Sequence, residues 1–146
     1  MSNQNPPFET TLLVRDSCFC LHVQRSARAL ARRFDEAFRA LELKSGQFSL
    51  LMSLNRPVPP TIGSVAALLA MDRTTLTANL KPLERRGLVQ VTIDPDDRRS
   101  RRLKLTPAGG KLLRAAVPIW KRTHAAIEKR LPLAAADVRT ALQALC

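Results

Sequence analysis

Residues 72–106 read DRTTLTANLKPLERRGLVQVTIDPDDRRSRRLKLT, and this stretch decides the fold. Its first part, residues 72–86, has leucines at helical spacing after an aspartate that can cap a helix. Residues 87–93 and 103–105 alternate apolar and polar side chains around an arginine-rich turn, which predicts a two-stranded hairpin. A helix followed by a basic hairpin fits double-stranded DNA, because the helix can enter the major groove and the hairpin can reach the adjacent minor groove.

Further helices are predicted on the N-terminal side of this stretch. An irregular tail, residues 1–8, precedes one long helix over about residues 9–43. Ser45 can cap a second helix and Thr61 can cap a third. The short turn between the third helix and Asp72 then makes a helix-turn-helix unit.

On the C-terminal side, Thr106 and Pro107 predict the start of a fifth helix, because proline at the first helical position loses no hydrogen bond. Pro118 is expected to bend that helix, and a last helix is predicted over about residues 134–145. The predicted fold class is mainly α with a small β-hairpin wing. It is one winged helix-turn-helix domain with long helices at both ends.

The long N-terminal helix carries a regular apolar seam that suits packing along another helix. The residues of this seam follow alternating spacings of three and four: Cys20, Val23, Ala27, Leu30, Phe34, Ala37 and Leu41. Five arginines of the same helix lie off the seam: Arg25, Arg28, Arg32, Arg33 and Arg39.

Composition favours a polyanionic partner. The 146 residues contain 24 Lys and Arg against 12 Asp and Glu, a net charge of +12, which suits nucleic acid or an acidic membrane surface. No apolar run approaches the roughly 20 residues that cross a bilayer. Residues 1–7 lack the basic start and apolar core of a secretory signal. Three cysteines form no even disulfide framework, so we expect a cytoplasmic protein.

The helix that follows Asp72 has two distinct faces. Leu76, Leu80 and Leu83 fall together on a helical wheel and are expected to face the core. The opposite face offers hydroxyls, a methyl group and cations that can contact bases and phosphates. The residues predicted to bind DNA on this helix are Arg73 near its start and then Thr74, Thr77, Ala78, Lys81 and Arg85.

The hairpin has its own DNA-binding features. Val89, Val91 and Ile93 alternate with polar residues, so one strand face is expected to be buried. A narrow minor groove attracts an inserted arginine, and the hairpin's tip is rich in arginine. Asp97 is expected to hold the guanidinium of Arg99 in a fixed pose. The other arginines at the tip are Arg98, Arg101 and Arg102.

These motifs resemble the MarR family of bacterial transcription regulators. The resemblance covers about residues 10–146 and is densest in the hairpin, where Asp97-x-Arg99 is followed by the Leu-Thr-x-x-Gly of residues 105–109. The other matching segments are Asp72 to Thr77, Leu83 to Val89 and Asp94 to Ser100.

The resemblance implies an obligate homodimer on double-stranded DNA with a pseudo-palindromic operator. Residues of about 9–43 and 106–146 would then be dimerisation helices, and about 45–105 the DNA-binding lobe, within a single domain 1–146. The fourth helix would lie in the major groove and Arg99 in the minor groove. Many family members carry arginine where Ala78 stands, which removes one expected contact.

Cys18, Cys20 and Cys146 are candidate redox residues, because some members of the family sense oxidants with a cysteine early in the first helix. In a continuous helix Cys18 and Cys20 would point about 200° apart and could not bond. Cys20 lies on the seam and is expected to be buried, whereas His22 and Arg25 could favour the Cys18 thiolate. The family's hydroperoxide sensors place tyrosines beside the cysteine, and this chain has none. A metal site at Cys18 and His22 has little support, since no further ligand stands at diagnostic spacing, and no cofactor is expected.

The resemblance also implies an effector crevice between the dimerisation helices and the winged lobe. A ligand there could change the spacing of the two reading helices, and we expect a small aromatic or acidic compound. The predicted lining is Arg15, Phe19, His22, Phe48, Met52 and Trp120, with Leu51 and Leu112 beside them and Arg25 as a further cation.

The same features also fit alternatives to a repressor that an effector releases. One is a cysteine-based redox sensor of the same fold. Another is a basic protein that binds DNA or a membrane surface without sequence preference. An enzyme has little support, because the chain lacks a Gly-rich phosphate loop, a nucleophile elbow and paired carboxylates in an apolar setting.

Overall fold

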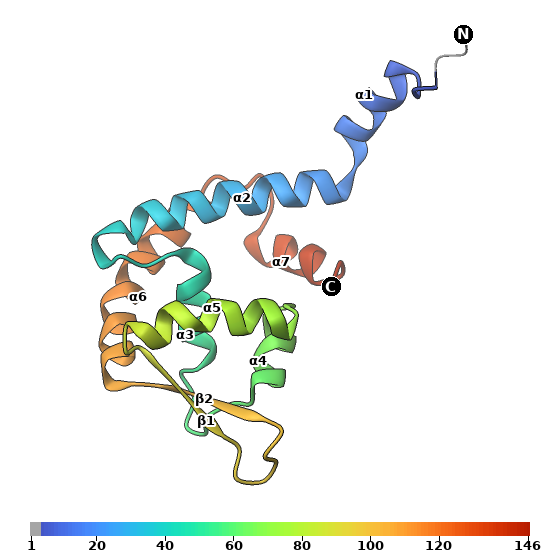
Figure 1. Cartoon of the computed structure of the whole chain (residues 1–146). Helices are drawn as coiled ribbons and strands as arrows, with labels where there is room; N and C mark the ends of the chain where they lie inside the picture. The colour runs from blue at the N-terminus through green and yellow to red at the C-terminus, as the bar shows by residue number, and fades with distance from the viewer. Residues whose placement is uncertain (1–3) are drawn as a thin grey trace.

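Helices pack above a small antiparallel hairpin in the computed structural model, which describes residues 4–146 (Figure 1). The elements in chain order are α1 (Phe8–Ser17), α2 (Phe19–Ala37), the 3-10 helix η1 (Arg39–Leu41), α3 (Ser45–Ser53), α4 (Ile62–Leu68), α5 (Arg73–Arg85), β1 (Val89–Ile93), β2 (Arg101–Leu105), α6 (Pro107–Glu128) and α7 (Ala135–Gln143). This order confirms the predicted fold class of a mainly α, winged helix-turn-helix protein.

The core lies between the end of α2, α3, α5, the base of the hairpin and α6. Phe38, Leu51, Leu76, Leu83 and Leu103 are fully buried there, although they come from four different parts of the chain. Burying such side chains supplies most of the driving force for folding. The core therefore joins α5 and the β1–β2 hairpin to the long helices α2 and α6.

Three predicted helix caps are confirmed. The side chains of Thr61, Asp72 and Thr106 accept hydrogen bonds from backbone N–H groups in the first turns of α4, α5 and α6, at 3.2, 2.8 and 3.0 Å. Ser45, in contrast, is the first residue of α3 and not its cap. The carboxylate of Asp35, at the end of α2, accepts the Ser45 N–H at 2.7 Å and takes over part of that role.

The predicted long N-terminal helix is wrong in two respects, because it is broken at Cys18 and because α2 ends at Ala37, before the 3-10 helix η1. The backbone of Cys18 is extended, with φ −71° and ψ 112°, and this residue caps α2 by accepting the Leu21 N–H on its sulfur at 3.5 Å. The preceding helix, α1, begins at Phe8 and projects away from the rest of the molecule (Figure 1). The predicted tail shortens to residues before Phe8, and its first three residues lie outside the part of the chain that the structure describes.

The apolar seam of α2 is only half covered. Its C-terminal members Phe34 and Ala37 are half-buried against the rest of the chain. Its N-terminal members stay exposed, with Val23 at 37% and Leu30 at 40% of their full accessibility. Cys20, predicted to be buried on this seam, is exposed in the single chain. A second surface is needed to cover the seam.

The hairpin pairs β1 and β2 in antiparallel register, with Val89 opposite Leu105 and Val91 opposite Leu103. Val89 is buried and Val91 half-buried, as predicted, but Ile93 is 58% exposed because it lies beyond the edge of the core. The loop before α4 runs alongside β2, where the Leu103 N–H donates to the carbonyl of Pro60 at 2.9 Å. This third segment anchors the wing to the lobe.

Gly109 explains the glycine of the Leu-Thr-x-x-Gly motif. A Cβ at this position would lie 2.3 Å from the backbone oxygen of Leu88, so any other residue would displace the backbone. The hydroxyl of Thr106 donates to the carbonyl of Gly87 at 2.7 Å beside this contact. The start of α6 therefore lies directly against the base of the wing.

The remaining predictions on α6 and α7 hold at their boundaries within one or two residues. Pro118 lies inside α6, and the bend that it should cause stays a prediction. None of the helices described in residues 4–146 has the length and apolar character that a membrane crossing requires.

Candidate nucleic-acid interface

Helix α5 presents one polar face to solvent. Leu76, Leu80 and Leu83 anchor its other face in the core. All six residues predicted to contact DNA from this helix are exposed: Arg73, Thr74, Thr77, Ala78, Lys81 and Arg85. The helix starts at Asp72, whose hydrogen bonds from the Thr75 backbone and hydroxyl lower the pKa of its carboxyl.

Thr77 is restricted in what it can offer a base. Its hydroxyl already donates to the backbone oxygen of Arg73 at 2.8 Å. What remains for DNA is an oxygen lone pair and a methyl group. These fit a base that donates a hydrogen bond, or the methyl group of thymine.

Gly63, at the start of α4, is a residue that the sequence did not single out. A Cβ built on Gly63 would lie 2.8 Å from Nη2 of Arg73, so the guanidinium of Arg73 rests directly over this glycine. The absence of a side chain at Gly63 thus sets the pose of the first cation of α5. Only the tertiary contact between the two helices could reveal this pairing.

The wing has a buried ionic anchor that was also missed. Asp94 is only 4% exposed, and its carboxylate accepts the Asp96 N–H at 3.0 Å and pairs with Nε of Arg102 at 3.3 Å. Arg102 also donates to the carbonyl of Pro59 at 2.8 Å. Arg102, one of the four arginines predicted at the tip, is therefore held inside the lobe.

Asp97 shapes the wing in a different way from the one predicted. Its carboxylate accepts the backbone N–H of Arg99 at 3.0 Å, and its carbonyl accepts the N–H of Ser100 at 2.9 Å. The aspartate therefore fixes the backbone of the turn, where we expected it to hold the guanidinium of Arg99. It still controls where the Arg99 side chain leaves the wing.

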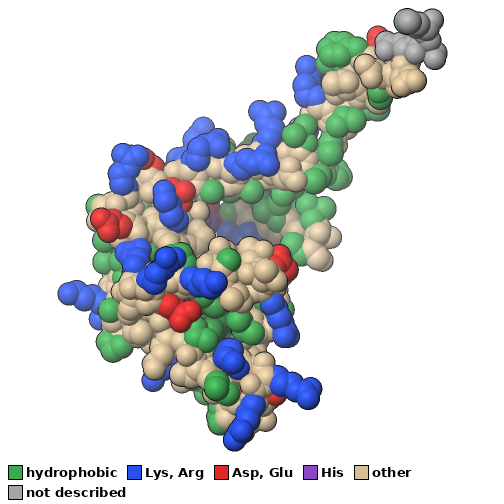
Figure 2. All heavy atoms as spheres, viewed as in Figure 1, with side chains coloured by type: hydrophobic (Ala, Val, Ile, Leu, Met, Phe, Trp, Pro, Cys, Tyr) green, Lys and Arg blue, Asp and Glu red, His purple; other side chains and the backbone are tan. Residues whose placement is uncertain are grey.

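Arg98, Arg99 and Arg101 are exposed at the tip. Arg101 folds back and donates to the carbonyls of Arg98 and Ser100 at 3.1 and 3.3 Å. Lys and Arg side chains gather at the tip of the hairpin and again over α5 (Figure 2). This surface joins two basic elements on one lobe, which is the arrangement that double-stranded DNA requires.

The predicted effector residues separate into two groups. Phe48, Met52 and Trp120 line one cavity of about 450 Å³ between α3, the end of α4 and α6, together with Ser49, Ser53, Leu68, Leu69 and Val117. Leu51 is part of the core and Leu112 packs against it.

The three other predicted residues do not line this cavity. Arg15 pairs with Asp16 at 2.7 Å on α1, and Phe19 is 76% exposed. The ring of His22 makes a hydrogen bond of 2.8 Å with the carbonyl of Cys18. The break at Cys18 carries α1, and Arg15 with it, away from the lobe, whereas Phe19 and His22 lie at the start of α2.

Stacked rings form one wall of the cavity. Phe48 lies 5.0 Å from Phe38 and 6.4 Å from Trp120, measured between ring centroids. Trp120 stacks in turn on His124 at 4.8 Å, and His124 lies 3.3 Å from the carboxylate of Glu128. His124 thus belongs to a side-chain network on α6.

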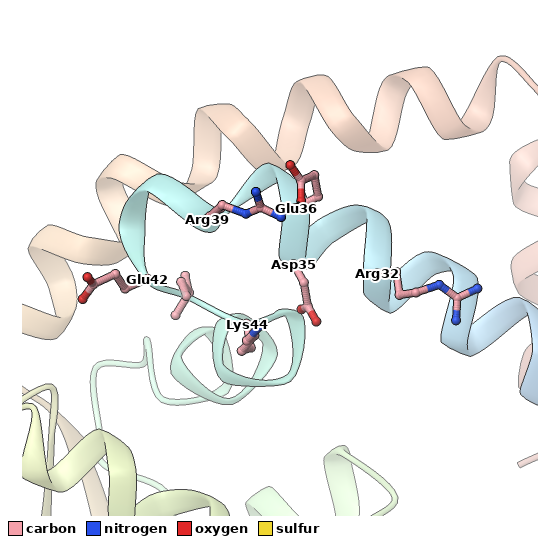
Figure 3. Close-up of a pocket in the computed structure, with 7 residues that line it drawn as sticks. Arg32, Asp35, Glu36, Arg39, Glu42 and Lys44 are labelled. Carbon is pink, nitrogen blue, oxygen red and sulfur yellow. Dashed lines mark hydrogen bonds and ion pairs between the residues drawn. The ribbon is translucent and has the colours of Figure 1, made fainter.

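A second hollow lies at the junction of α2, η1 and α3, lined by side chains of both charges: Arg32, Asp35, Glu36, Arg39, Glu42 and Lys44 (Figure 3). Two of its three carboxylates are already engaged, since Asp35 accepts the N–H of Ser45 and Glu36 pairs with Arg39. This hollow is a structural junction between helices.

The cysteines do not lie as the continuous helix predicted. Cys18 is half-buried and outside α2, whereas Cys20 and Cys146 are exposed. The argument that Cys18 and Cys20 point apart on one helix therefore no longer applies. Within residues 4–146, no cluster of three His, Cys, Asp or Glu side chains could hold a metal ion.

Comparison with known proteins shows which family this chain resembles. The family model described as "MarR family" matches residues 43–100, from the end of η1 to the tip of the wing. The chain is 34% identical to the transcriptional regulator MosR of Mycobacterium tuberculosis in its complex with DNA, with a TM-score of 0.82. The match covers 88% of this chain and 93% of MosR. The chain belongs to the MarR family.

Other MarR-family relatives agree with this assignment. The chain is 35% identical over 77 residues to the transcriptional repressor NicR of Pseudomonas putida, which is 53% of this chain and 49% of NicR, so it spans about half of that relative's length. It is 27% identical to the repressor CouR, from Rhodococcus jostii RHA1, on a 23-mer DNA duplex, with a TM-score of 0.72 and coverage of 90% and 92%. This MarR-family chain is a transcription regulator with a winged helix-turn-helix.

Proposed function

We propose that the protein is a homodimeric transcriptional repressor that binds a pseudo-palindromic operator. The observation that carries this proposal is the common surface of α5 and the wing. There the exposed polar face of α5 and the free arginines Arg98 and Arg99 stand on one rigidly packed lobe. In this complex α5 reads the major groove and Arg99 enters the minor groove.

The dimer in this proposal is supported by uncovered apolar surface. The N-terminal half of the α2 seam is exposed, and α1 exposes Phe8, Leu13 and Val14 with no buried residue of its own. Contiguous apolar surface of this extent marks an interface. A second copy that covers α1 and α2 gives the two-fold symmetry of a palindromic site.

Nuclease footprinting on genomic fragments selected by the protein tests this function. A dimer protects two half-sites about 10 bp apart, or a multiple of one helical turn. Lys81→Ala weakens binding to specific and random duplexes alike if Lys81 contacts phosphate. Equal protection of unrelated sequences would overturn the proposal in favour of a basic protein without sequence preference.

We further propose that a neutral aromatic compound in the cavity beside Trp120 releases the operator. The support is the composition of the lining, which consists of apolar and aromatic side chains with two serines and holds no Lys, Arg or His. An acidic effector would lose its hydration there without gaining a cation. The aromatic part of the predicted effector class is retained, and the acidic part loses its support.

Trp120 is the chain's single tryptophan and reports on this cavity directly. We expect benzamide to quench Trp120 fluorescence and release the operator more effectively than benzoate, which has the same size but carries a charge. Ser49→Phe, which fills the cavity from its exposed rim, should abolish both responses. A stronger response to benzoate would contradict a neutral effector, and no response to either would exclude the cavity as the switch.

A redox switch is the second candidate, favoured by the position of Cys18 at the break between α1 and α2. One relative, 29% identical over 112 residues, is the organic hydroperoxide resistance regulator of Bacillus subtilis. In this alternative a hydroperoxide oxidises the thiols of Cys18 and Cys20 to a disulfide and is reduced to an alcohol and water. Operator release by peroxide that disappears in Cys18→Ser would support it, and release unchanged in Cys18→Ser would exclude it.

A further inference from the structure

Half of the net positive charge of this protein lies outside its DNA-reading lobe. Residues 44–105, from the N-cap of α3 to the end of β2, hold 11 Lys and Arg and five Asp and Glu, a net +6 of the chain's +12. The flanking helices hold the other half. The operator accounts for the charge of the lobe, and the flanking charge has no role in that contact.

Much of the flanking charge is concentrated on one face of α2. Arg25, Arg28 and Arg32 are exposed, and the sequence contains no carboxylate between Asp16 and Asp35. None of the three arginines makes an ion pair or a side-chain hydrogen bond with any residue that the structure describes. Lys and Arg side chains run along the outer edge of α2 (Figure 2). We call these three residues the α2 arginine row.

The geometry of the α2 arginine row suits a polyphosphate backbone. At a rise of about 1.5 Å per residue, positions 25, 28 and 32 span roughly 10 Å along α2 and lie within about 60° of arc. A strand of duplex DNA places one phosphate about every 3.4 Å of its axis, so the row can meet phosphates of one strand. Arg33 and Arg122 extend the basic surface, since both border the same open groove as Arg32.

This face stays open when the apolar seam is covered. Val23, Ala27 and Leu30 of the seam lie on the opposite side of α2 from the α2 arginine row, about 160° away on a helical wheel. A second copy that packs on the seam therefore leaves the arginines in solvent. The α2 arginine row is therefore exposed in the dimer as well as in the single chain.

The row is too far from the wing to assist its contact with the operator. The hairpin lies at the opposite end of the lobe from α2, with α3 and α5 between them (Figure 1). Two helix layers separate charges by about 20 Å, whereas the Debye length is about 8 Å at physiological salt. The field of these arginines is therefore screened before it reaches the wing.

We propose that the α2 arginine row binds a second segment of duplex DNA while α5 and the wing hold the operator. One molecule then joins two DNA segments. The second contact is to phosphates alone and carries no sequence preference. This inference goes beyond operator recognition and relies on it only to hold the first segment.

A two-duplex capture experiment tests the proposal. The operator duplex obtained by footprinting is fixed to a surface and saturated with protein, and a labelled random-sequence duplex is then added. We expect the wild type to retain the labelled duplex. The triple variant R25Q/R28Q/R32Q should retain about ten-fold less, because three phosphate contacts are lost, with unchanged operator affinity.

Two matched variants separate a specific surface from general charge. K121Q/K129Q/R130Q removes the same charge from exposed positions of α6 and its C-terminal end, and it should retain the labelled duplex within about two-fold of wild type. R25K/R28K/R32K keeps the charge and should restore capture, because lysine also neutralises phosphates and releases their counterions. Equal losses in the two glutamine variants would overturn the proposal.

A second binding measurement does not depend on the operator. Arg99→Ala protein fixed to the surface should still bind the random duplex, and adding the three α2 substitutions should weaken that binding, whereas adding K121Q/K129Q/R130Q should not. A wild type that does not bind the operator would contradict the repressor function. The measurement with Arg99→Ala protein would still test the α2 arginine row in that case. Absence of any α2-dependent binding would overturn the proposal. The proposal would also be overturned if the α2 arginine row bound phosphatidylglycerol vesicles and not duplex DNA, because the row would then belong to a membrane-binding surface.

Discussion

Arg99 and Arg102 belong to the same basic wing, yet their surroundings indicate different roles, DNA binding for Arg99 and folding stability for Arg102. Arg99 is exposed, whereas Arg102 is held by the buried carboxylate of Asp94 and the carbonyl of Pro59. Arg99→Ala should reduce operator binding by roughly 1–3 kcal/mol and leave folding stability unchanged. Arg102→Ala should reduce folding stability by about 1–3 kcal/mol, because Asp94 loses its partner.

Urea denaturation and operator titration of both variants measure these two effects separately. Asp97→Ala is the informative third variant, because Asp97 holds the backbone of Arg99. It should lose part of the affinity that Arg99→Ala loses. Full operator affinity in Arg99→Ala would remove the wing from the mechanism.

Gly63 offers a second test at the residue scale. In Gly63→Ala the new methyl group would contact Nη2 of Arg73, the far end of a flexible side chain, and should displace it. Operator affinity should fall several-fold, while stability stays constant or rises by up to about 1 kcal/mol because alanine favours a helix.

Gly46→Ala is the matched control for this substitution. Gly46 is also the second residue of its helix, and a Cβ there meets no atom within 4 Å. This variant should gain the same helix propensity with unchanged DNA binding. Combining Gly63→Ala with Arg73→Ala should add no further loss of affinity, and an additive loss would mean that Gly63 acts through another residue.

At the scale of elements, the start of α5 should make stability depend on pH. Hydrogen bonds from Thr75 lower the pKa of Asp72 in the folded protein. A carboxyl with a lowered pKa stabilises the fold above its unfolded pKa, and that contribution is lost as the pH falls through the folded pKa. The loss should therefore begin below about pH 4, the ordinary range of aspartate.

Asp72→Asn keeps a capping oxygen but cannot titrate in this range. Urea unfolding at a series of acidic pH values should show a shallower decline of the free energy of unfolding than in the wild type. The two proteins should converge at the lowest pH. Parallel curves would show that the Asp72 cap makes no pH-dependent contribution.

At the scale of the whole molecule, the exposed seam should assemble two chains. Sedimentation at micromolar concentration should give about twice the 16.2 kDa of one chain. Leu30→Glu places a charge in the seam and should produce monomers with greatly weakened operator binding. Val58→Glu is the control, because Val58 is 68% exposed in a loop far from the seam. A monomeric wild type would exclude this architecture.

Net charge makes a further prediction for the whole molecule. Phosphate contacts release counterions, so the logarithm of operator affinity should fall linearly with the logarithm of salt concentration. Lys81→Ala should reduce that slope by about 1 for each subunit if Lys81 contacts phosphate. R25Q/R28Q/R32Q should leave it unchanged, because the α2 arginine row lies beyond the screening length. A flat salt response of the wild type would contradict phosphate binding.

The sequence by itself determined the features that depend on neighbours along the chain. A cap and the backbone groups it binds lie within three residues, which is why Thr61, Asp72 and Thr106 could be recognised. The helical period likewise identified the buried leucines of α5, and the wing motif identified the family. Each of these signals is contained in one short segment.

Only the tertiary structure decided the features that depend on distant segments. Arg102 and Pro59 are 43 residues apart, and no local pattern distinguishes Arg102 from the free arginines beside it. The extended backbone of Cys18 carries α1 away and removes Arg15 from the cavity that it was predicted to line. Local patterns state what a residue can do, whereas long-range packing selects which partner it meets, because burial and charge pairing depend on the whole fold.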